Sequence, residues 1–198
     1  MTPRTARLLL ALGAFVAGLV LFTAVIFIVT GRSPAPIAMS SAIGGPFKLV
    51  DQNSKPITEQ DLKGQPFLVF FGFTHCPDVC PTTLFEVSEI FRALGSDAKN
   101  VRALFVTVDP ERDTPGVLKD YLSSFDPRVI GVTGDVAAIT SVEKAYRVYA
   151  KKVPLDGGNY TMDHTALVYL MDKDGRFVAP FNMKRRPEEA AADLKRYL

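Results

Sequence analysis

Residues 67–81 read FLVFFGFTHCPDVCP, an apolar run of strand length followed at once by the only two cysteines of the chain, Cys76 and Cys80. The residues from Pro81 onward have helical periodicity. A strand that enters a helix through a short loop places that loop at the carboxyl end of the sheet, where open α/β folds carry their chemistry. A cysteine at a helix start also lies in a field that favours its thiolate. We therefore expect this loop to be the functional centre.

Outward from this stretch, strands alternate with helices. The patterns predict strands at 47–53, 67–73, 101–108, 129–133, 165–171 and 176–179, a brief helical turn at 57–62, and helices at 81–94, 115–125, 135–151 and 187–198. Asp174-Gly175 is a hairpin signal between the last two strands. This order predicts an α/β, thioredoxin-like fold over residues 46–198, with a mixed central sheet and helices on both faces.

The N-terminal region predicts a membrane anchor. Residues 8–30 contain no charged side chain, and a span of about 20 apolar residues crosses the hydrocarbon core of a bilayer. A cleavable signal peptide has a shorter apolar region, so we interpret 8–30 as one transmembrane signal-anchor. Residues 1–7 carry Arg4 and Arg7, which favours a cytoplasmic N-terminus. The rest of the chain then lies outside the cytoplasm of a bacterium, anchored in the inner membrane with its soluble domain in the periplasm, where disulfides are permitted.

Composition indicates how the chain is divided and excludes one class of partner. Residues 31–45 are rich in Pro, Gly and Ser and predict a flexible linker. The 198 residues suffice for one domain with a sizeable core beside these appendages. The formal net charge of +2 argues against nucleic-acid binding.

The two cysteines allow more than one chemistry. A spacing of four brings their side chains together if the intervening turn is helical, so they could close a disulfide or hold one metal ion. The spacing is C-x-x-x-C and not the C-x-x-C of dithiol oxidoreductases. No second cysteine pair exists to complete a structural zinc site. Two buried, inert cysteines are the plain alternative, against which the flanking prolines and the loop position argue.

Two histidines could add a nitrogen ligand. His164 lies in a polar loop just before a strand that a thioredoxin-like layout places antiparallel to the central one, so it should face the cysteine loop. His75 adjoins Cys76, and we expect it on the rim. Two thiolates and an imidazole suit Cu(I), tolerate Cu(II) and leave zinc one ligand short. Met162 and Met171 are further soft donors, for which core packing is the simpler role.

Three motifs together resemble the Sco/SenC family of membrane-anchored copper-binding assembly factors of cytochrome c oxidase. They are GFTHCPDVCPTTL at 72–84, VDPERDTP at 108–115, and DHT at 163–165. The resemblance covers nearly all of the chain after the linker. It implies a thioredoxin-like fold whose copper ligands correspond to Cys76, Cys80 and His164. One departure is Thr165, where many members carry Ser.

The resemblance also implies a function and partners. The expected role is a metallochaperone that delivers copper to the binuclear CuA site of cytochrome c oxidase subunit II. The alternative is a thiol–disulfide oxidoreductase that keeps the CuA cysteines reduced. Another periplasmic copper chaperone or a thioredoxin-like reductant would be a further partner. Asp109, Arg112 and Asp113 match the family pattern too; they are either a loop beside the site or simply a strand-end turn and helix cap.

Overall fold

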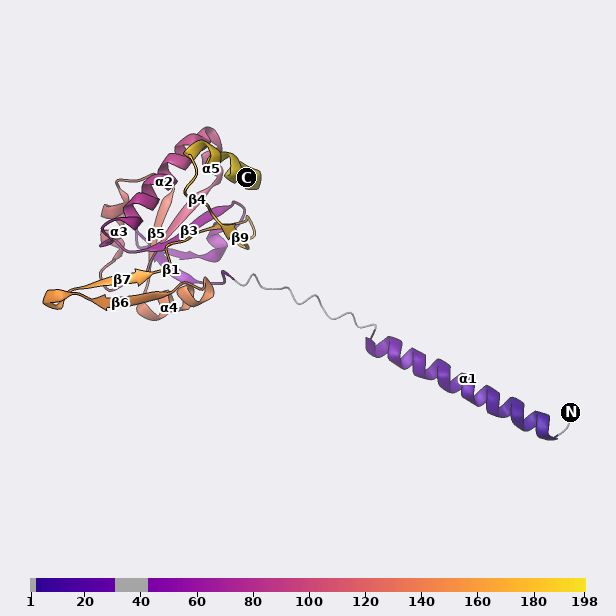
Figure 1. Ribbon diagram of the computed structural model, residues 1–198. Helices are drawn as coiled ribbons and strands as arrows, with labels where there is room; N and C mark the ends of the chain where they lie inside the picture. Colours follow the sequence, from indigo (N-terminus) through magenta and orange to yellow (C-terminus); the bar gives the residue numbers. More distant parts are fainter. Residues whose placement is uncertain (1–2, 31–42) are drawn as a thin grey trace. The chain divides into compact units, whose positions relative to one another are not determined.

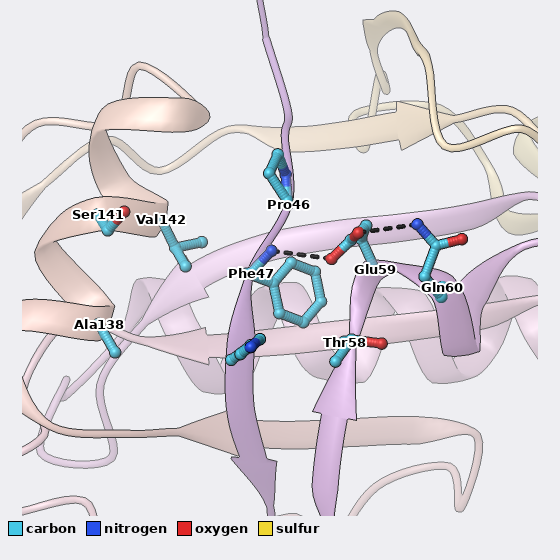
Figure 2. A pocket seen from close by; sticks show the side chains of 9 residues that line it. Pro46, Phe47, Thr58, Glu59, Gln60, Ala138, Ser141 and Val142 are labelled. Atoms are coloured by element: carbon cyan, nitrogen blue, oxygen red, sulfur yellow. Dashed lines mark hydrogen bonds between the residues drawn. The ribbon is translucent and has the colours of Figure 1, made fainter.

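The computed structural model describes residues 3–30 and 43–198, with the side chains of 4–12 and 26–30 excepted. The chain divides into two units, Met1–Ser40 and Ser41–Leu198, each described by itself. The first contains helix α1, Pro3–Thr30 (Figure 1). Within the part of the chain that the structure describes, no helix combines the length and apolarity needed to cross a membrane. The anchor expected over 8–30 therefore stays a prediction, and most of the expected linker, 31–42, lies outside the described residues.

The second unit is built on a mixed seven-stranded sheet of order β2-β1-β5-β4-β3-β8-β9. Its strands are β1 Lys48–Asp51, β2 Pro56–Thr58, β3 Phe67–Gly72, β4 Arg102–Thr107, β5 Val129–Thr133, β8 Val168–Met171 and β9 Phe177–Pro180. Strands β3, β4 and β5 run parallel, whereas β1 and β8 are antiparallel to their neighbours in the middle of the sheet. All six residues of β3 are buried, as its continuous apolar sequence requires when both faces of a strand are covered.

Helices cover both faces of this sheet, as expected. They are α2 Val79–Leu94, α3 Pro115–Leu122, α4 Val136–Ala145 and α5 Pro187–Leu194, with short 3-10 turns η1 Glu59–Leu62, η2 Gly95–Asn100, η3 Asp156–Gly158 and η4 Lys195–Tyr197. Adjacent side chains of β3 point to opposite faces. Phe70 packs on Phe105, whose ring meets Tyr121 of α3, whereas Phe71 packs on Tyr146 at the end of α4. Figure 1 shows α2 beside α5, away from α4.

The predicted helix over 135–151 is too long. Helix α4 ends at Ala145, and Arg147 adopts a left-handed φ of 55°, which a helix cannot accommodate. The chain then forms a separate two-stranded antiparallel sheet of β6, Ala150–Pro154, and β7, Tyr160–His164. In place of this hairpin, the sequence patterns predict the end of a helix followed by a polar loop. The next strand accordingly begins at Val168 and not at 165.

Candidate metal centre

The cysteines lie where β3 passes into α2. The Cys76 N–H donates to the Phe73 carbonyl oxygen at 3.2 Å, which closes the loop after the strand. Helix α2 begins at Val79, two residues earlier than the proline suggested, and the Thr82 N–H bonds to the Asp78 carbonyl at 3.2 Å. Pro81 fits within this first turn because no intrahelical bond from its nitrogen is needed there. Cys80 is therefore inside the helix and buried, while Cys76 stands before it and is half-buried.

Cys80 is seated closely against the end of β3. A Cβ on Gly72 would lie 2.8 Å from the Cys80 sulfur and 2.6 Å from Cε2 of Phe105. Phe105 and Cys80 are both fully buried, so neither can move aside into solvent. Only glycine at position 72 leaves room for the sulfur where it is.

His164 is the last residue of β7 and turns its Nε2 toward Cys80, 3.8 Å from the sulfur. Its Nδ1 lies 3.2 Å from the Thr165 carbonyl oxygen. A carbonyl oxygen can only accept, so Nδ1 carries the proton and Nε2 keeps its lone pair. The edges of Phe73 and Phe70 meet the imidazole, with ring centroids 5.7 and 6.4 Å away. The ring is thus oriented for ligation through Nε2.

The structure brings the three candidate ligands together. The two sulfurs and a histidine nitrogen all lie within 4.8 Å of one another. His75 is exposed, and its Nδ1 lies 3.2 Å from the Thr74 hydroxyl, so it is on the rim as expected. Met171 is fully buried and Met162 packs against the core. Two soft sulfurs with one imidazole form a donor set that fits copper.

The electrostatics of the site correct one expectation. Burial raises the pKa of the Cys80 thiol, and this outweighs the helix start, so the metal-free thiol is protonated at neutral pH. Burial lowers the pKa of His164, so its imidazole is neutral and available as a ligand. An ion that binds here must displace a proton from Cys80, whereas it need displace none from His164 at neutral pH.

The buried carboxylate of Asp113 supports the cysteine loop. The sequence left open whether this residue is structural or lies beside the site. Asp113 is fully buried. It accepts hydrogen bonds from the Thr74 hydroxyl at 2.6 Å, the Thr74 N–H at 3.1 Å and the Thr107 hydroxyl at 2.7 Å. These bonds fix the residue two positions before Cys76 to the end of β4. Thr74 and Thr107 carried no sequence signal of this role, since their spacing from Asp113 is set by the tertiary fold.

Comparisons with known proteins identify similar chains, two of them in structures with copper bound. A family model described as SCO1/SenC matches residues 36–198. A structure of Bradyrhizobium japonicum ScoI with copper bound is 68% identical, covers 79% of this chain and 99% of its own, and superposes with a TM-score of 0.77. A copper-bound crystal structure of yeast Sco1 is 36% identical, covers 79% and 90%, and has a TM-score of 0.70. A SCO2-like protein of Rickettsia felis is 41% identical over 155 residues, which are 77% of this chain and 76% of the relative.

Proposed function

Because this chain belongs to the SCO1/SenC family, we propose that it is a copper metallochaperone of cytochrome c oxidase assembly that delivers copper to the CuA site of oxidase subunit II. The observation that carries the proposal is the convergence of the Cys76 and Cys80 sulfurs with an imidazole nitrogen of His164 within 4.8 Å. Cys76, Cys80 and His164 are the proposed copper ligands. The two sulfurs are sufficient for Cu(I), whereas Cu(II) binds the two sulfurs and the nitrogen of His164.

The unequal burial of the two sulfurs supports a route for transfer. Cys76 is half-buried and stands before the helix, whereas Cys80 lies in its first turn and is buried. A thiolate of an acceptor protein can approach copper from the side of Cys76 and replace this ligand first. Cys80 and His164 retain the ion until a second acceptor ligand arrives. The copper is thereby passed by ligand exchange without release into water.

The same two sulfurs could instead reduce a partner's disulfide. An oriented imidazole with a free Nε2 lone pair is the observation that favours copper, since a dithiol reductase does not require it. The raised pKa of Cys80 also leaves this sulfur a poor nucleophile in the absence of metal. Thiol reduction is therefore the second candidate, which the experiment below separates from copper transfer.

We also propose a location outside the cytoplasm, with residues 8–30 as a single-pass anchor in the bacterial inner membrane. The uncharged sequence of 8–30 and the basic residues Arg4 and Arg7 before it support this orientation. The soluble domain would then share the periplasm with the exposed CuA domain of subunit II.

The test loads the purified full-length chain anaerobically with Cu(I), with zinc as competitor, and mixes it with a metal-free CuA domain of subunit II. The proposal expects one copper per chain, little zinc, and transfer of copper to a CuA domain whose cysteines are already reduced. Transfer of electrons to an oxidised CuA domain, with no copper retained by the chain, would instead establish the thiol reductase.

A further inference from the structure

The hairpin that carries His164 contacts the domain at few points, among them Ala150 and Met162, which pack against the core, and Lys152, which pairs with Glu111. Strands β6 and β7 form a sheet of their own, apart from the seven-stranded sheet. None of the ten residues in these two strands is fully buried. An isolated two-stranded hairpin is marginally stable in water, and a region with few buried apolar contacts opens at low free-energy cost. The position of His164 therefore depends on whatever anchors this hairpin to the domain.

One anchor lies directly beside the histidine. The Thr165 N–H donates to the Tyr149 carbonyl oxygen at 3.0 Å, and the Tyr149 N–H donates to the Thr165 hydroxyl at 3.1 Å. These bonds join the chain just before β6 to the chain just after β7. They hold the base of the hairpin, whereas Tyr160 lies at the other end of β7.

A second anchor holds the opposite end of β7. The Tyr160 hydroxyl donates to Oδ1 of Asp109 at 2.8 Å. Arg112 pairs through Nε with the other carboxylate oxygen of Asp109 and donates through Nη1 to the Tyr160 carbonyl at 3.1 Å. The Arg112 guanidinium also lies over the Tyr160 ring, 3.7 Å from its centroid. The Asp109–Arg112 ion pair thus contacts the hydroxyl, the carbonyl and the ring of Tyr160.

This ion pair is rigidly placed. Asp109 is 1% exposed, and its N–H donates to the Thr107 hydroxyl at 2.9 Å. Nη2 of Arg112 is buried and has no hydrogen-bond partner among the described residues. An unpaired buried N–H of a guanidinium costs free energy.

The loop that supplies Asp109 and Arg112 also supplies Asp113, which holds Thr74 and with it the cysteine loop. One segment, residues 107–113, therefore contacts both the loop that carries Cys76 and the strand that carries His164. We propose that the Tyr160–Asp109–Arg112 cluster is a positioning group that fixes His164 relative to Cys76 and Cys80, an inference that rests on the proposed copper function.

The cluster acts on one oxidation state of copper more than on the other. Tyr160 and His164 are the two ends of β7, about 14 Å apart at the usual rise of a strand, so the tilt of β7 and with it the direction of the imidazole depend on how Tyr160 is held. Two thiolates satisfy Cu(I), whereas Cu(II) requires the nitrogen as well. Loss of the cluster weakens Cu(II) binding and spares Cu(I).

The test uses the full-length chain with Tyr160→Phe, which removes only the hydroxyl that bonds to Asp109. Loss of a direct outer contact of a metal ligand costs about 10–100-fold in affinity, and Tyr160 acts on His164 only through β7, so we expect the lower end of this range. We expect the Cu(II) dissociation constant to rise about tenfold and the Cu(I) constant to stay within about twofold. The Cu(II)/Cu(I) reduction potential then rises by about 59 mV, the value of a tenfold change for one electron. Arg112→Lys, which keeps the charge and loses the planar stacking, should shift the potential in the same direction.

Two controls separate the inference from the proposed function. Tyr149→Phe removes a hydroxyl near the same hairpin, where the exposed ring forms no hydrogen bond among the described residues, and should leave both affinities unchanged. His164→Ala should raise the potential more than Tyr160→Phe does. A normal potential in Tyr160→Phe together with a raised one in His164→Ala overturns the positioning role and leaves the copper function standing. Equal losses of Cu(I) and Cu(II) in Tyr160→Phe also overturn it, because they indicate general destabilisation. An unchanged potential in His164→Ala removes the histidine from the site, and both proposals fall.

Discussion

Replacement of Gly72 by alanine tests the placement of Cys80 without replacing any proposed ligand. The added methyl would lie 2.8 Å from the Cys80 sulfur and 2.6 Å from the Phe105 ring. To reach an ordinary contact of 3.4 Å, the sulfur must retreat by about 0.6 Å. Metal sites tolerate shifts of about 0.2 Å in ligand distance, so this displacement exceeds what a bound copper can absorb. The phi angle of Gly72 is not positive, so the backbone itself does not oppose alanine.

The expected result has two parts. Overpacking of a buried site costs about 1–3 kcal/mol, which lowers the melting temperature by about 2–4 °C per kcal/mol in a domain of this size. Copper affinity should fall at least about tenfold, as for other disturbed ligand supports. The assay is thermal unfolding of the metal-free chain together with competitive Cu(I) titration. Gly116→Ala is the matched control, since a Cβ there meets nothing within 4 Å. If Gly72→Ala melts and binds copper as Gly116→Ala does, the packing of Cys80 against β3 is wrong.

Four further predictions concern the ligands themselves. His164→Ala should retain Cu(I) and raise the copper reduction potential, while the exposed His75→Ala should match the wild type; cyclic voltammetry of both decides this. A disulfide between Cys76 and Cys80 consumes both thiolates, so tight titration of either copper ion into the fully oxidised chain would contradict the site. Because burial raises the pKa of Cys80, copper displaces its proton, and affinity should rise about tenfold per pH unit for that proton from pH 7 to 9. The same raised pKa stabilises the metal-free fold below the thiol's ordinary pKa of 9.0 and ceases to do so as the pH rises further, a loss that alkaline denaturant titrations would detect.

Much of the sheet could be predicted because its signals are local. The run 67–72 is apolar without interruption, and a strand covered on both faces has that sequence. Asp174-Gly175 correctly marked the turn between β8 and β9, where Gly175 has a φ of 78°. Thr114 and Pro115 correctly placed the start of α3, where the Thr114 side chain accepts from the Val117 N–H.

The hairpin β6–β7 could not be predicted because its signals are weak. Its side chains are either exposed or only partly buried, so no alternation of buried and exposed residues distinguishes its strands. The helical periodicity before it continues past Ala145, and only the left-handed backbone of Arg147 ends the helix. His164 nevertheless faces the cysteine loop as predicted, because β8 runs antiparallel to β3 and the residues before β8 therefore lie at the end of β3.

The support of the site was not predictable from spacing. Asp113 lies 39 residues from Thr74, and Asp109 lies 51 residues from Tyr160, so only the tertiary fold brings these pairs together. The prediction that the helix start gives Cys80 thiolate character is also wrong. A helix start favours the anion, but the fully buried sulfur loses more by desolvation than it gains, and sequence alone does not show how deeply a residue lies.

X-ray absorption at the copper edge of the Cu(I)-loaded full-length chain tests the central claim most directly. The proposed site predicts one copper per chain with two sulfur ligands from Cys76 and Cys80, to which loading with Cu(II) adds one nitrogen from His164, and it predicts that the sulfur scattering disappears in the Cys76→Ser, Cys80→Ser double variant. Copper surrounded by nitrogen and oxygen alone, or bound in the double variant at unchanged stoichiometry, would contradict it.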